Sequence, residues 1–305
     1  MINVKKEYRQ KSKTLIVANP YSGSGRNQQI VSKLKAALYQ RGMEAHIMWD
    51  PYERTKLLQN SQRLASYRCV IAAGGDGTVA DVVNETLDIP VVMMPIGSEN
   101  LFARQFGYRR INEVADLVVY GHEHTIDLGR AGSRLFTLMV SAGFDGDVVH
   151  RVAKWRVNGS GLKRVNKLSY AWPIFNAVTS YDYPSVELEA DGQVYRGVHA
   201  LVFNIPQYAC RLKFVNSAAQ CDDGLLDWVV FEKPGLATMA RYMTGLAVGG
   251  LHLRMADVHH GTAKKITLRS ATGSPVPIQI DGDPAGYTPI TTEIIPKRLR
   301  VIVPA

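Results

Sequence analysis

The sequence predicts an α/β domain with a parallel sheet, followed by a β-rich domain. Strand and helix patterns alternate over the first 125 residues, which is typical of parallel strands joined by helical crossovers. After Thr125 strand patterns dominate, and helical spacing returns in only two stretches. The chain has 305 residues, 46% of them hydrophobic, which is enough material for two ordinary domains. We therefore expect domains at residues 1–126 and 127–292, with 293–305 as a segment that could complete the first.

The first domain reads as four strands separated by helices. Short buried-strand patterns cover residues 15–18, 45–49, 69–73 and 91–94. Apolar residues at helical spacing predict helices near residues 30–38, 57–64, 79–87, 100–106 and 112–120. Gly42 is placed to end the first helix, and Pro90 separates the third helix from the fourth strand.

The second domain reads mainly as strands. They are expected at residues 135–140, 185–190, 199–204, 226–231, 265–269, 277–280 and 299–303. The two helical stretches lie near residues 148–178 and 236–253. Internal repeats and low-complexity linkers are absent from the sequence, so nothing in it marks the domain boundary sharply.

Composition narrows the class of protein. The net charge of +9 favours an anionic partner, which could be a nucleotide, a nucleic acid or a membrane surface, although it could also serve solubility alone. No nucleic-acid recognition motif accompanies the charge, so we do not expect nucleic-acid binding. The three cysteines cannot all pair and none lies in a CxxC motif, which predicts reduced thiols in a cytoplasmic protein. No apolar run approaches the roughly 20 residues that cross a bilayer.

The strongest chemical signal is the run Ala73-Gly74-Gly75-Asp76-Gly77-Thr78 between a predicted strand and a predicted helix. Glycines there let the backbone approach a bulky anion, and the helix that starts near Thr78 offers free N–H groups to phosphate. Asp76 would lie at the carboxyl end of its strand, where open α/β sheets bind ligands. Beside phosphates a carboxylate acts mainly through a cation, so Asp76 is a candidate for Mg²⁺. The alternative is a tight turn in which Asp76 caps the next helix, and the two roles can coexist.

Two further turns follow other strands of the same sheet. The first runs from Asn19 to Arg26, and it lacks the Gly-Lys-Ser/Thr of a Walker A loop. The second runs from Pro95 to Arg104 and contains Ser98, Glu99 and Asn100. Each alone is a weak signal, but three phosphate-type turns at the ends of three strands predict one binding site.

These motifs, in this order, resemble the diacylglycerol-kinase catalytic family. Its relatives include sphingosine and ceramide kinases and, more distantly, NAD kinases and phosphofructokinases. The resemblance covers nearly the whole chain, because later segments match too: residues 141–145 (SAGFD), 222–227 (DDGLLD) and 280–283 (IDGD). It implies an N-terminal NAD-kinase/phosphofructokinase-like α/β domain and a C-terminal β-sandwich-like domain. It also implies ATP and Mg²⁺ as cofactors, a lipid alcohol as substrate and an active site in the cleft between the domains.

The resemblance assigns roles to particular residues. Asp76 corresponds to the aspartate of the nucleotide–magnesium site. Asp222 and Asp223 resemble a site that holds a structural Mg²⁺ in some bacterial relatives. The nucleotide contacts would come from the three turns: Asn19, Ser22, Gly23, Ser24, Gly25, Arg26, Gly74, Gly75, Gly77, Thr78, Ser98, Glu99 and Asn100.

Two departures from the family pattern bear on activity. Leu101 stands where aspartate commonly follows the asparagine, so a role of that carboxylate in metal binding is missing or shifted to Glu99. The family usually reads Asp-Gly-Glu near its C-terminus, with the glutamate as general base, and here the run is Asp281-Gly282-Asp283. We expect Asp283 to be the catalytic base, with Asp281 as the next candidate. The alternative for Asp283 is an ordinary turn residue before Pro284.

Residues 148–181 contain six basic residues, Arg151, Lys154, Arg156, Lys163, Arg164 and Lys167, together with Trp155 and Trp172. The stretch carries no acidic residue, and the first one after it is Asp182. This composition suits contact with an anionic membrane. A solvated helix face with core tryptophans is the alternative. Met239, Met243, Leu246, Leu251 and Leu253 could line an acyl cleft, but core packing is the more ordinary reading.

The sequence thus predicts an ATP- and Mg²⁺-dependent lipid kinase, and it leaves two rivals open. One is a kinase for NAD or another small alcohol, and the other is a catalytically weak nucleotide- or lipid-binding regulator. The identity of the lipid and the oligomeric state, including a homodimer, also stay open.

Overall fold

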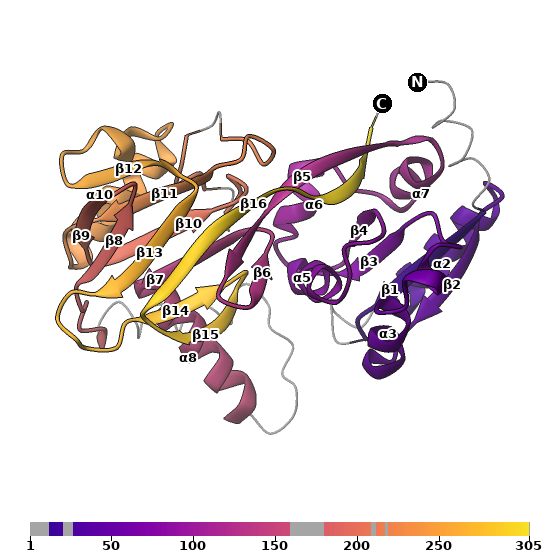
Figure 1. The fold of residues 1–305 in the computed structure, drawn as a ribbon, viewed down its shortest axis with the longest axis horizontal. Helices are drawn as coiled ribbons and strands as arrows, with labels where there is room; N and C mark the ends of the chain where they lie inside the picture. Colours follow the sequence, from indigo (N-terminus) through magenta and orange to yellow (C-terminus); the bar gives the residue numbers. More distant parts are fainter. Residues whose placement is uncertain (1–11, 21–26, 159–179, 209–211, 217–218, 305) are drawn as a thin grey trace. The chain divides into compact units, whose positions relative to one another are not determined.

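The computed structural model describes residues 12–20, 27–158, 180–208, 212–216 and 219–304. The chain forms two compact units (Figure 1). Unit 1 contains residues 1–126 and 297–305, and unit 2 contains residues 127–296. The predicted fold class, an α/β unit followed by a β-rich unit, is confirmed.

Unit 1 contains a parallel sheet with helices between its strands. Its strands in the order β2-β1-β3-β4 are parallel, and Val301 at the end of β16 lies opposite Val91 of β4. The elements are β1 (Lys13–Ala18), α2 (Asn27–Tyr39), β2 (Glu44–Met48), α3 (Pro51–Leu58), α4 (Ser61–Leu64), β3 (Val70–Gly74), α5 (Asp76–Glu85), β4 (Val91–Pro95), α6 (Leu101–Phe106) and α7 (Ile111–Tyr120).

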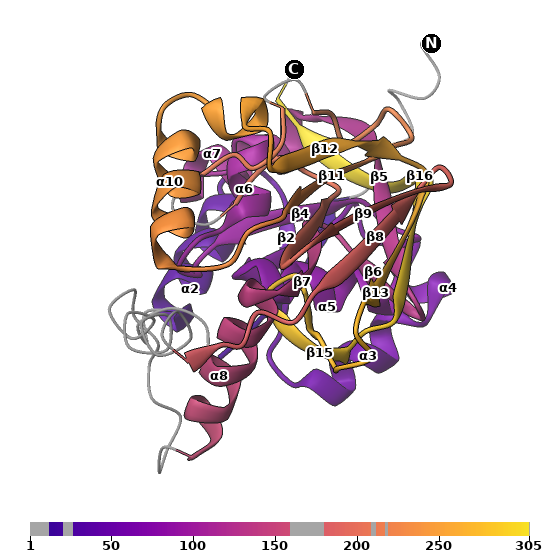
Figure 2. The same ribbon diagram turned by 90° about the vertical axis from the view of Figure 1, so that its left-hand side faces the viewer.

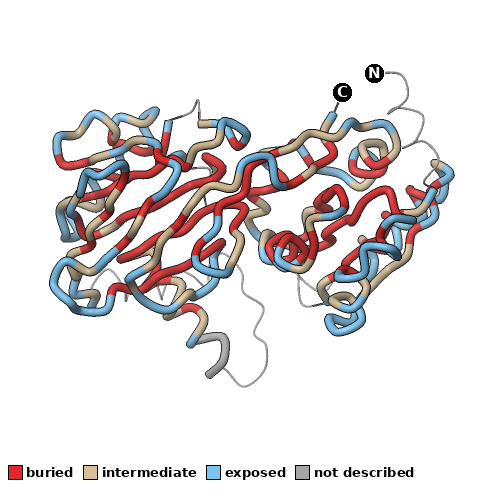
Figure 3. The backbone as a smooth tube through the Cα atoms, viewed as in Figure 1, coloured by how far each residue is buried: buried red, intermediate tan, exposed pale blue. Residues whose placement is uncertain are grey.

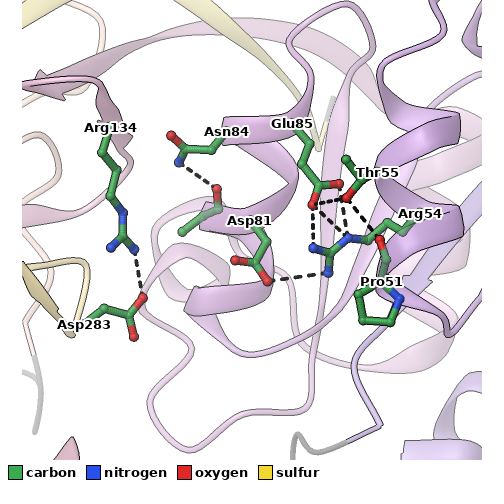
Figure 4. A network of polar contacts seen from close by, with 9 residues as sticks. Pro51, Arg54, Thr55, Asp81, Asn84, Glu85, Arg134 and Asp283 are labelled. Atoms are coloured by element: carbon green, nitrogen blue, oxygen red, sulfur yellow. Dashed lines mark hydrogen bonds and ion pairs between the residues drawn. The ribbon is translucent and has the colours of Figure 1, made fainter.

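The helix expected near residues 57–64 is in fact two helices. Asp50 caps α3 by accepting the Glu53 N–H at 2.9 Å, and Pro51 occupies the first turn. Asn60 then accepts the Arg63 N–H at 3.0 Å and starts α4. Because Asn60 caps a new helix within the apolar pattern, the single helix predicted from that pattern is divided in two. Arg54 of α3 pairs with Glu85 of α5 and so ties these two helices together (Figure 4).

Unit 2 is built from two sheets. One has the order β12-β11-β10-β7-β14-β15, and the other contains β9, β8, β13 and the first part of β16, with β5 and β6 alongside. The elements are β5 (His122–Ala131), β6 (Arg134–Phe136), β7 (Met139–Gly143), α8 (Phe144–Asn158), β8 (Val186–Ala190), β9 (Gln193–Gly197), β10 (His199–Phe203), β11 (Leu226–Phe231), α10 (Leu236–Ala247), η3 (Leu251–Arg254), β12 (Val258–Ala263), β13 (Lys265–Ser270), β14 (Pro277–Ile280), β15 (Asp283–Tyr287) and β16 (Ile290–Val303).

The core of unit 2 follows the alternation of its strands. Val140 and Ala142 of β7 and Val202 of β10 pack with Leu188 of β8 and Ile266 of β13 in one apolar cluster. Side chains of both sheets therefore face one another, as in a sandwich. Figure 3 shows the buried residues concentrated along these central strands. Among the described residues, no helix is both long and apolar enough to span a bilayer.

The strand expected at residues 135–140 is interrupted. β6 ends at Phe136 and β7 begins at Met139, because the carboxylate of Asp281 accepts the N–H groups of Thr137, Leu138 and Met139. Most of the stretch predicted near 148–178 lies outside the described residues, and α8 covers its first part.

Candidate active site

The turns after β1, β3 and β4 are hydrogen-bonded to one another at the carboxyl edge of the parallel sheet. The Asn19 N–H donates to the Ala73 carbonyl at 3.3 Å, and the Ile96 N–H donates to the Gly74 carbonyl at 2.8 Å. Gly75 and Gly97 meet backbone to backbone, since a Cβ built on Gly97 would lie 2.5 Å from the Gly75 Cα. Only glycine at position 97 permits this approach, so the glycines of two separate motifs form one structure.

Asp76 is the first residue of α5, and its side chain joins two of these turns. Its Oδ1 accepts the Phe102 N–H of α6 at 2.9 Å. Burial raises the pKa of Asp76, while the N–H groups of Phe102 and Leu101 and the charge of Arg104 act in the opposite direction. Asp76 thus caps α6 rather than its own helix, whose N-cap Gly75 has no side chain.

Three buried polar atoms around these turns have no hydrogen-bond partner within the described part of the chain. They are Thr78 Oγ1 on α5, Asn100 Oδ1 before α6 and Asn27 Oδ1 at the start of α2. An unsatisfied buried polar atom costs about 1–3 kcal/mol, so such atoms need an explanation. A ligand rich in hydroxyl groups and phosphate oxygens would satisfy them, because Thr78 can donate and the two amide oxygens can accept.

Asn100 and Asn27 owe their positions to local hydrogen bonds. Asn100 adopts a left-handed backbone with φ 51°, and its Nδ2 donates to the Gly97 carbonyl at 2.8 Å. Asn27 is almost completely buried, and its Nδ2 donates to the Asn19 carbonyl at 2.7 Å. Sequence reasoning missed Asn27, although a polar residue opening a helix after a Gly/Ser loop is a usable signal.

The other residues that were predicted to contact the nucleotide differ in exposure. Ser98 and Gly77 are exposed, and Glu99 pairs with Arg104 at 3.4 Å. Leu101 is buried in the first turn of α6. Ser22, Gly23, Ser24, Gly25 and Arg26 lie outside the described residues.

In unit 2 the two aspartates of the Asp281-Gly282-Asp283 turn have different environments. Asp281 is buried, and both its oxygens accept hydrogen bonds: Oδ2 from Thr137 N at 2.8 Å and Thr137 Oγ1 at 3.0 Å, Oδ1 from Leu138 N and Met139 N at 2.9 Å. Burial raises its pKa, against the effect of these four donors. Asp283 is exposed at the start of β15, and its Oδ2 accepts from Arg134 Nη2 at 2.8 Å (Figure 4). Asp281 therefore holds the fold, whereas the Asp283 carboxylate is exposed.

A buried polar network supports this turn. Gln279 accepts the Gly282 N–H at 2.8 Å and donates to Asp145 at 2.9 Å, and Ser141 donates to the same Asp145 oxygen at 2.7 Å. The matching segment SAGFD and the IDGD segment are thus parts of one arrangement. The role of Gln279 was not predicted, because it depends on contacts far apart in sequence.

The second predicted metal site is less complete. Asp222 and Asp223 are both exposed, and Asp223 Oδ1 accepts the Leu225 N–H at 3.0 Å. Burial and the charge of Asp223 raise the pKa of nearby Asp227 to about 6. Within the described residues, no group of three or more His, Cys, Asp or Glu side chains is arranged to hold a metal ion. A metal at Asp222 and Asp223 therefore stays a prediction.

At Asp76 the residues fit Mg²⁺ in another way. Mg²⁺ beside nucleotide phosphates usually takes one or two protein carboxylates, and the remaining positions are filled by phosphate oxygens and water. The single carboxylate of Asp76, two residues before the unpartnered hydroxyl of Thr78, meets that requirement.

Comparison with known proteins agrees with this geometry. Residues 13–131 match the diacylglycerol kinase catalytic domain, and residues 138–303 match the YegS C-terminal NAD kinase beta sandwich-like domain. A diacylglycerol kinase of Staphylococcus carnosus is 24% identical over 297 residues, covering 95% of this chain and 94% of the relative. The Staphylococcus saprophyticus diacylglycerol kinase is 26% identical over 302 residues, with the same coverage.

A solved structure shows the same fold. The crystal structure of a candidate diacylglycerol kinase from Bacillus anthracis is similar with a TM-score of 0.75 at 22% identity, covering 96% of this chain and 95% of that one. The two family matches lie in order along the chain, and the second alone spans more than half of it. The chain belongs to the diacylglycerol kinase family, with a YegS-type C-terminal domain, and is a phosphotransferase that uses an alcohol group as acceptor.

Proposed function

We propose that this protein transfers the terminal phosphoryl group of ATP, with Mg²⁺, to the hydroxyl of a lipid of the diacylglycerol class. The observation that carries the proposal is the joined set of three turns in unit 1. They present Asp76 and the unsatisfied polar atoms of Thr78, Asn100 and Asn27 at the carboxyl edge of the sheet. The lipid class rests on the names of the Staphylococcus relatives.

The nucleotide would be held mainly by unit 1. The N-terminus of α5, which begins beside the close backbone contact of Gly75 and Gly97, would face phosphate oxygens. Thr78 Oγ1 would donate to a phosphate oxygen, and the amide oxygens of Asn100 and Asn27 would accept from nucleotide hydroxyl groups or bound water. When bound, Mg²⁺ would neutralise charge on the phosphates near Asp76.

The transfer itself needs a proton acceptor. The acceptor oxygen forms a bond to the terminal phosphorus, the bond from that phosphorus to the departing ADP oxygen breaks, and the hydroxyl proton must leave. We assign the proton to the Asp283 carboxylate, which is exposed and bound by only one side chain within the described residues. Arg134 would hold the carboxylate in orientation. That the acceptor meets the nucleotide between the two domains stays a prediction.

Association with an anionic membrane surface is part of the proposal, because the acceptor is a lipid. Most of the basic stretch that suggested it, residues 148–181, lies outside the described residues. Of its cations, Arg151 pairs with Asp147 on α8, so it is not available as a free charge.

The deciding experiment is transfer from ATP labelled in its terminal phosphate into a mixed lipid extract, followed by identification of the product. We expect a labelled lipid phosphate that requires Mg²⁺ and is formed about 10²-fold more slowly, or slower still, by Asp76→Asn. Label in a water-soluble alcohol without any lipid product would favour the small-alcohol kinase. Nucleotide binding without transfer to any acceptor would favour the regulator.

A further inference from the structure

Exposed apolar side chains gather on one segment of unit 2. Apart from tyrosines, five of the described residues have large hydrophobic side chains that are exposed. One of them, Val194, lies on β9, away from the other four in the sequence. The other four lie between Gly235 and Arg254, on α10, in the turn after it and at the start of η3. They are Leu236, Met243, Val248 and Leu251, with 66%, 40%, 56% and 44% of their surface exposed. Figure 2 shows this helix in orange at the left of the view.

The exposed side chains form a stripe along α10. Leu236, Ala240, Met243 and Ala247 recur at spacings of four, three and four residues, which places them on one face of a helix. The buried face is separate and includes Tyr242, Gly245 and Leu246. The residues that could have lined an acyl cleft therefore divide, since Leu246 is core while Met243 and Leu251 are exposed. The outer face therefore carries a narrow apolar stripe, beside which Thr244 and Arg241 are also exposed, and such a stripe is a candidate contact surface.

The charges around the stripe are positive. Residues 236–254 contain Arg241 and Arg254 and no Asp or Glu. The nearest following acid, Asp257, is buried and is bound by Arg241, Tyr242 and, at 3.9 Å, Lys233. Lys233 keeps 63% of its side chain exposed, and Arg254 is also exposed. Lys233 and Arg241 share the single carboxylate of Asp257, so this group keeps a net charge of +1 at one end of the stripe, and Arg254 adds a cation at the other. Glu232, which precedes Lys233 and has 39% of its side chain exposed, is paired with His259.

We propose that the outer face of α10, continued by Val248 and Leu251, inserts into the interface of an anionic lipid bilayer. The inference rests on the proposed function, because a kinase for a lipid hydroxyl must reach that hydroxyl at a membrane surface. An interfacial helix buries its apolar face about 5–10 Å into the headgroup boundary and places Lys and Arg among the phosphates. Each such cation near an anionic surface contributes roughly a factor of five in binding. A second copy on this face is disfavoured, because two-fold pairing would bring cationic flanks together.

Vesicle sedimentation of the full chain tests the inference without nucleotide or acceptor lipid. The vesicles contain phosphatidylcholine alone or equal parts phosphatidylcholine and phosphatidylglycerol. We expect the wild type to bind the anionic vesicles more tightly. We expect the double variant Leu236→Ser/Val248→Ser to bind them about 10- to 100-fold more weakly, from the apolar area lost at two half-exposed sites. Both side chains are exposed, so the thermal midpoint should not change.

Val194→Ser is the matched control, because Val194 is a similarly exposed aliphatic residue in the same unit. It should bind vesicles within about twofold of the wild type, by the same area argument. Equal binding by the double variant and the wild type overturns the inference, as does an equal loss in Val194→Ser. A smaller particle mass for the double variant by light scattering, with vesicle binding unchanged, overturns it in favour of a second copy. Transfer to a short-chain, water-soluble diacylglycerol should be retained by the double variant, so a failed docking and a failed kinase assignment give different results.

Discussion

At the scale of single residues, Asp76 has a structural role that a substitution must respect. Its carboxylate accepts the Phe102 N–H and so caps α6, while the same group is the candidate for the magnesium–phosphate site. Asparagine retains an acceptor oxygen for Phe102 and removes the charge. Alanine removes both. The two variants therefore separate catalysis from folding.

We expect Asp76→Asn to lower turnover by about 10²-fold or more, in line with the loss of one electrostatic contact to a transition state. Its thermal midpoint should stay close to that of the wild type. Asp76→Ala should lose turnover equally and also about 1 kcal/mol of stability, the typical contribution of a helix cap. Steady-state rates and thermal unfolding of the three proteins check this. Near-normal turnover in a folded Asp76→Asn would remove Asp76 from the reaction.

The neighbouring aspartates of unit 2 predict opposite phenotypes. Asp283→Asn should reduce turnover by about 10²–10⁴-fold, the range of general-base catalysis, with nucleotide affinity retained. Its stability should change by less than about 1 kcal/mol, because the Arg134 pair is exposed. Asp283→Glu introduces the glutamate of the family's usual Asp-Gly-Glu run and should keep or raise the turnover rate.

Asp281→Asn is the companion to that experiment. Its amide group would face backbone N–H donors that now meet a carboxylate oxygen, so we expect a loss of roughly 2–4 kcal/mol in unfolding free energy. If Asp283→Asn retains turnover with chemistry rate-limiting, the base lies elsewhere. If Asp281→Asn is as stable as the wild type, its structural role is wrong.

At the scale of elements, the contact between the β3–α5 and β4–α6 turns depends on Gly97. A Cβ there would lie 2.5 Å from the Gly75 Cα and 2.8 Å from Asn100 Oδ1, whereas a Cβ on Gly77 would meet nothing within 4 Å. We expect Gly97→Ala to lower the thermal midpoint and to weaken nucleotide binding at least tenfold, about 1.4 kcal/mol.

Gly77→Ala tests whether the missing side chain at this position serves ligand binding rather than packing within the protein. It lies in the first turn of α5, so alanine should leave stability unchanged or raise it by up to about 1 kcal/mol. Weaker nucleotide binding in this stable variant, measured by calorimetry, would place phosphate against Gly77. Unchanged binding would move the phosphate away from this residue. A Gly97→Ala protein as stable as the wild type would contradict the close packing of the two turns.

Helices and strands were predictable from the sequence where their buried apolar residues form a clear pattern. All four parallel strands of unit 1 lie within a residue or two of the expected positions, because each is a short apolar run bounded by turn residues. The strands β5, β9, β12 and β15 were missed, since they carry exposed polar residues and glycines such as those of His122–Ala131 and Asp283–Tyr287. The break between β6 and β7 was not predictable, because it depends on a carboxylate more than 140 residues away.

The candidate site was predictable to the same extent. Gly74 to Thr78 and Asn100 are recognisable because glycine turns between strand and helix are local in sequence. Asn27, Gln279 and the division of labour between Asp281 and Asp283 depend on burial and on distant partners, which no local pattern contains. For α10, helical spacing alone could not show which apolar side chains are buried. The exposed fractions in the structure distinguish them.

At the scale of the whole molecule, one partly buried histidine links stability to pH. His199 of β10 packs against Phe144 and Phe231, and its buried Nε2 has no partner among the described residues. Burial lowers its pKa from 6.5 to about 4, although the charge of Asp145 acts in the opposite direction. The native state therefore holds the imidazole neutral over a pH range in which the unfolded chain binds a proton.

The sign of the effect follows from these two values. Above pH 6.5 both states are neutral at this position and the stability contribution is complete. As the pH falls from 6.5 towards about 4, the unfolded chain gains a proton that the native protein does not, so stability is lost, by roughly 3 kcal/mol in total. We expect the urea midpoint of unfolding to fall across this range. His199→Met, which keeps an apolar side chain of similar volume against the aromatic rings, should flatten that fall while leaving the midpoint above pH 7 little changed. A wild type and a His199→Met variant with parallel pH dependence between 6.5 and 4 would show that other groups govern the acid sensitivity of the fold.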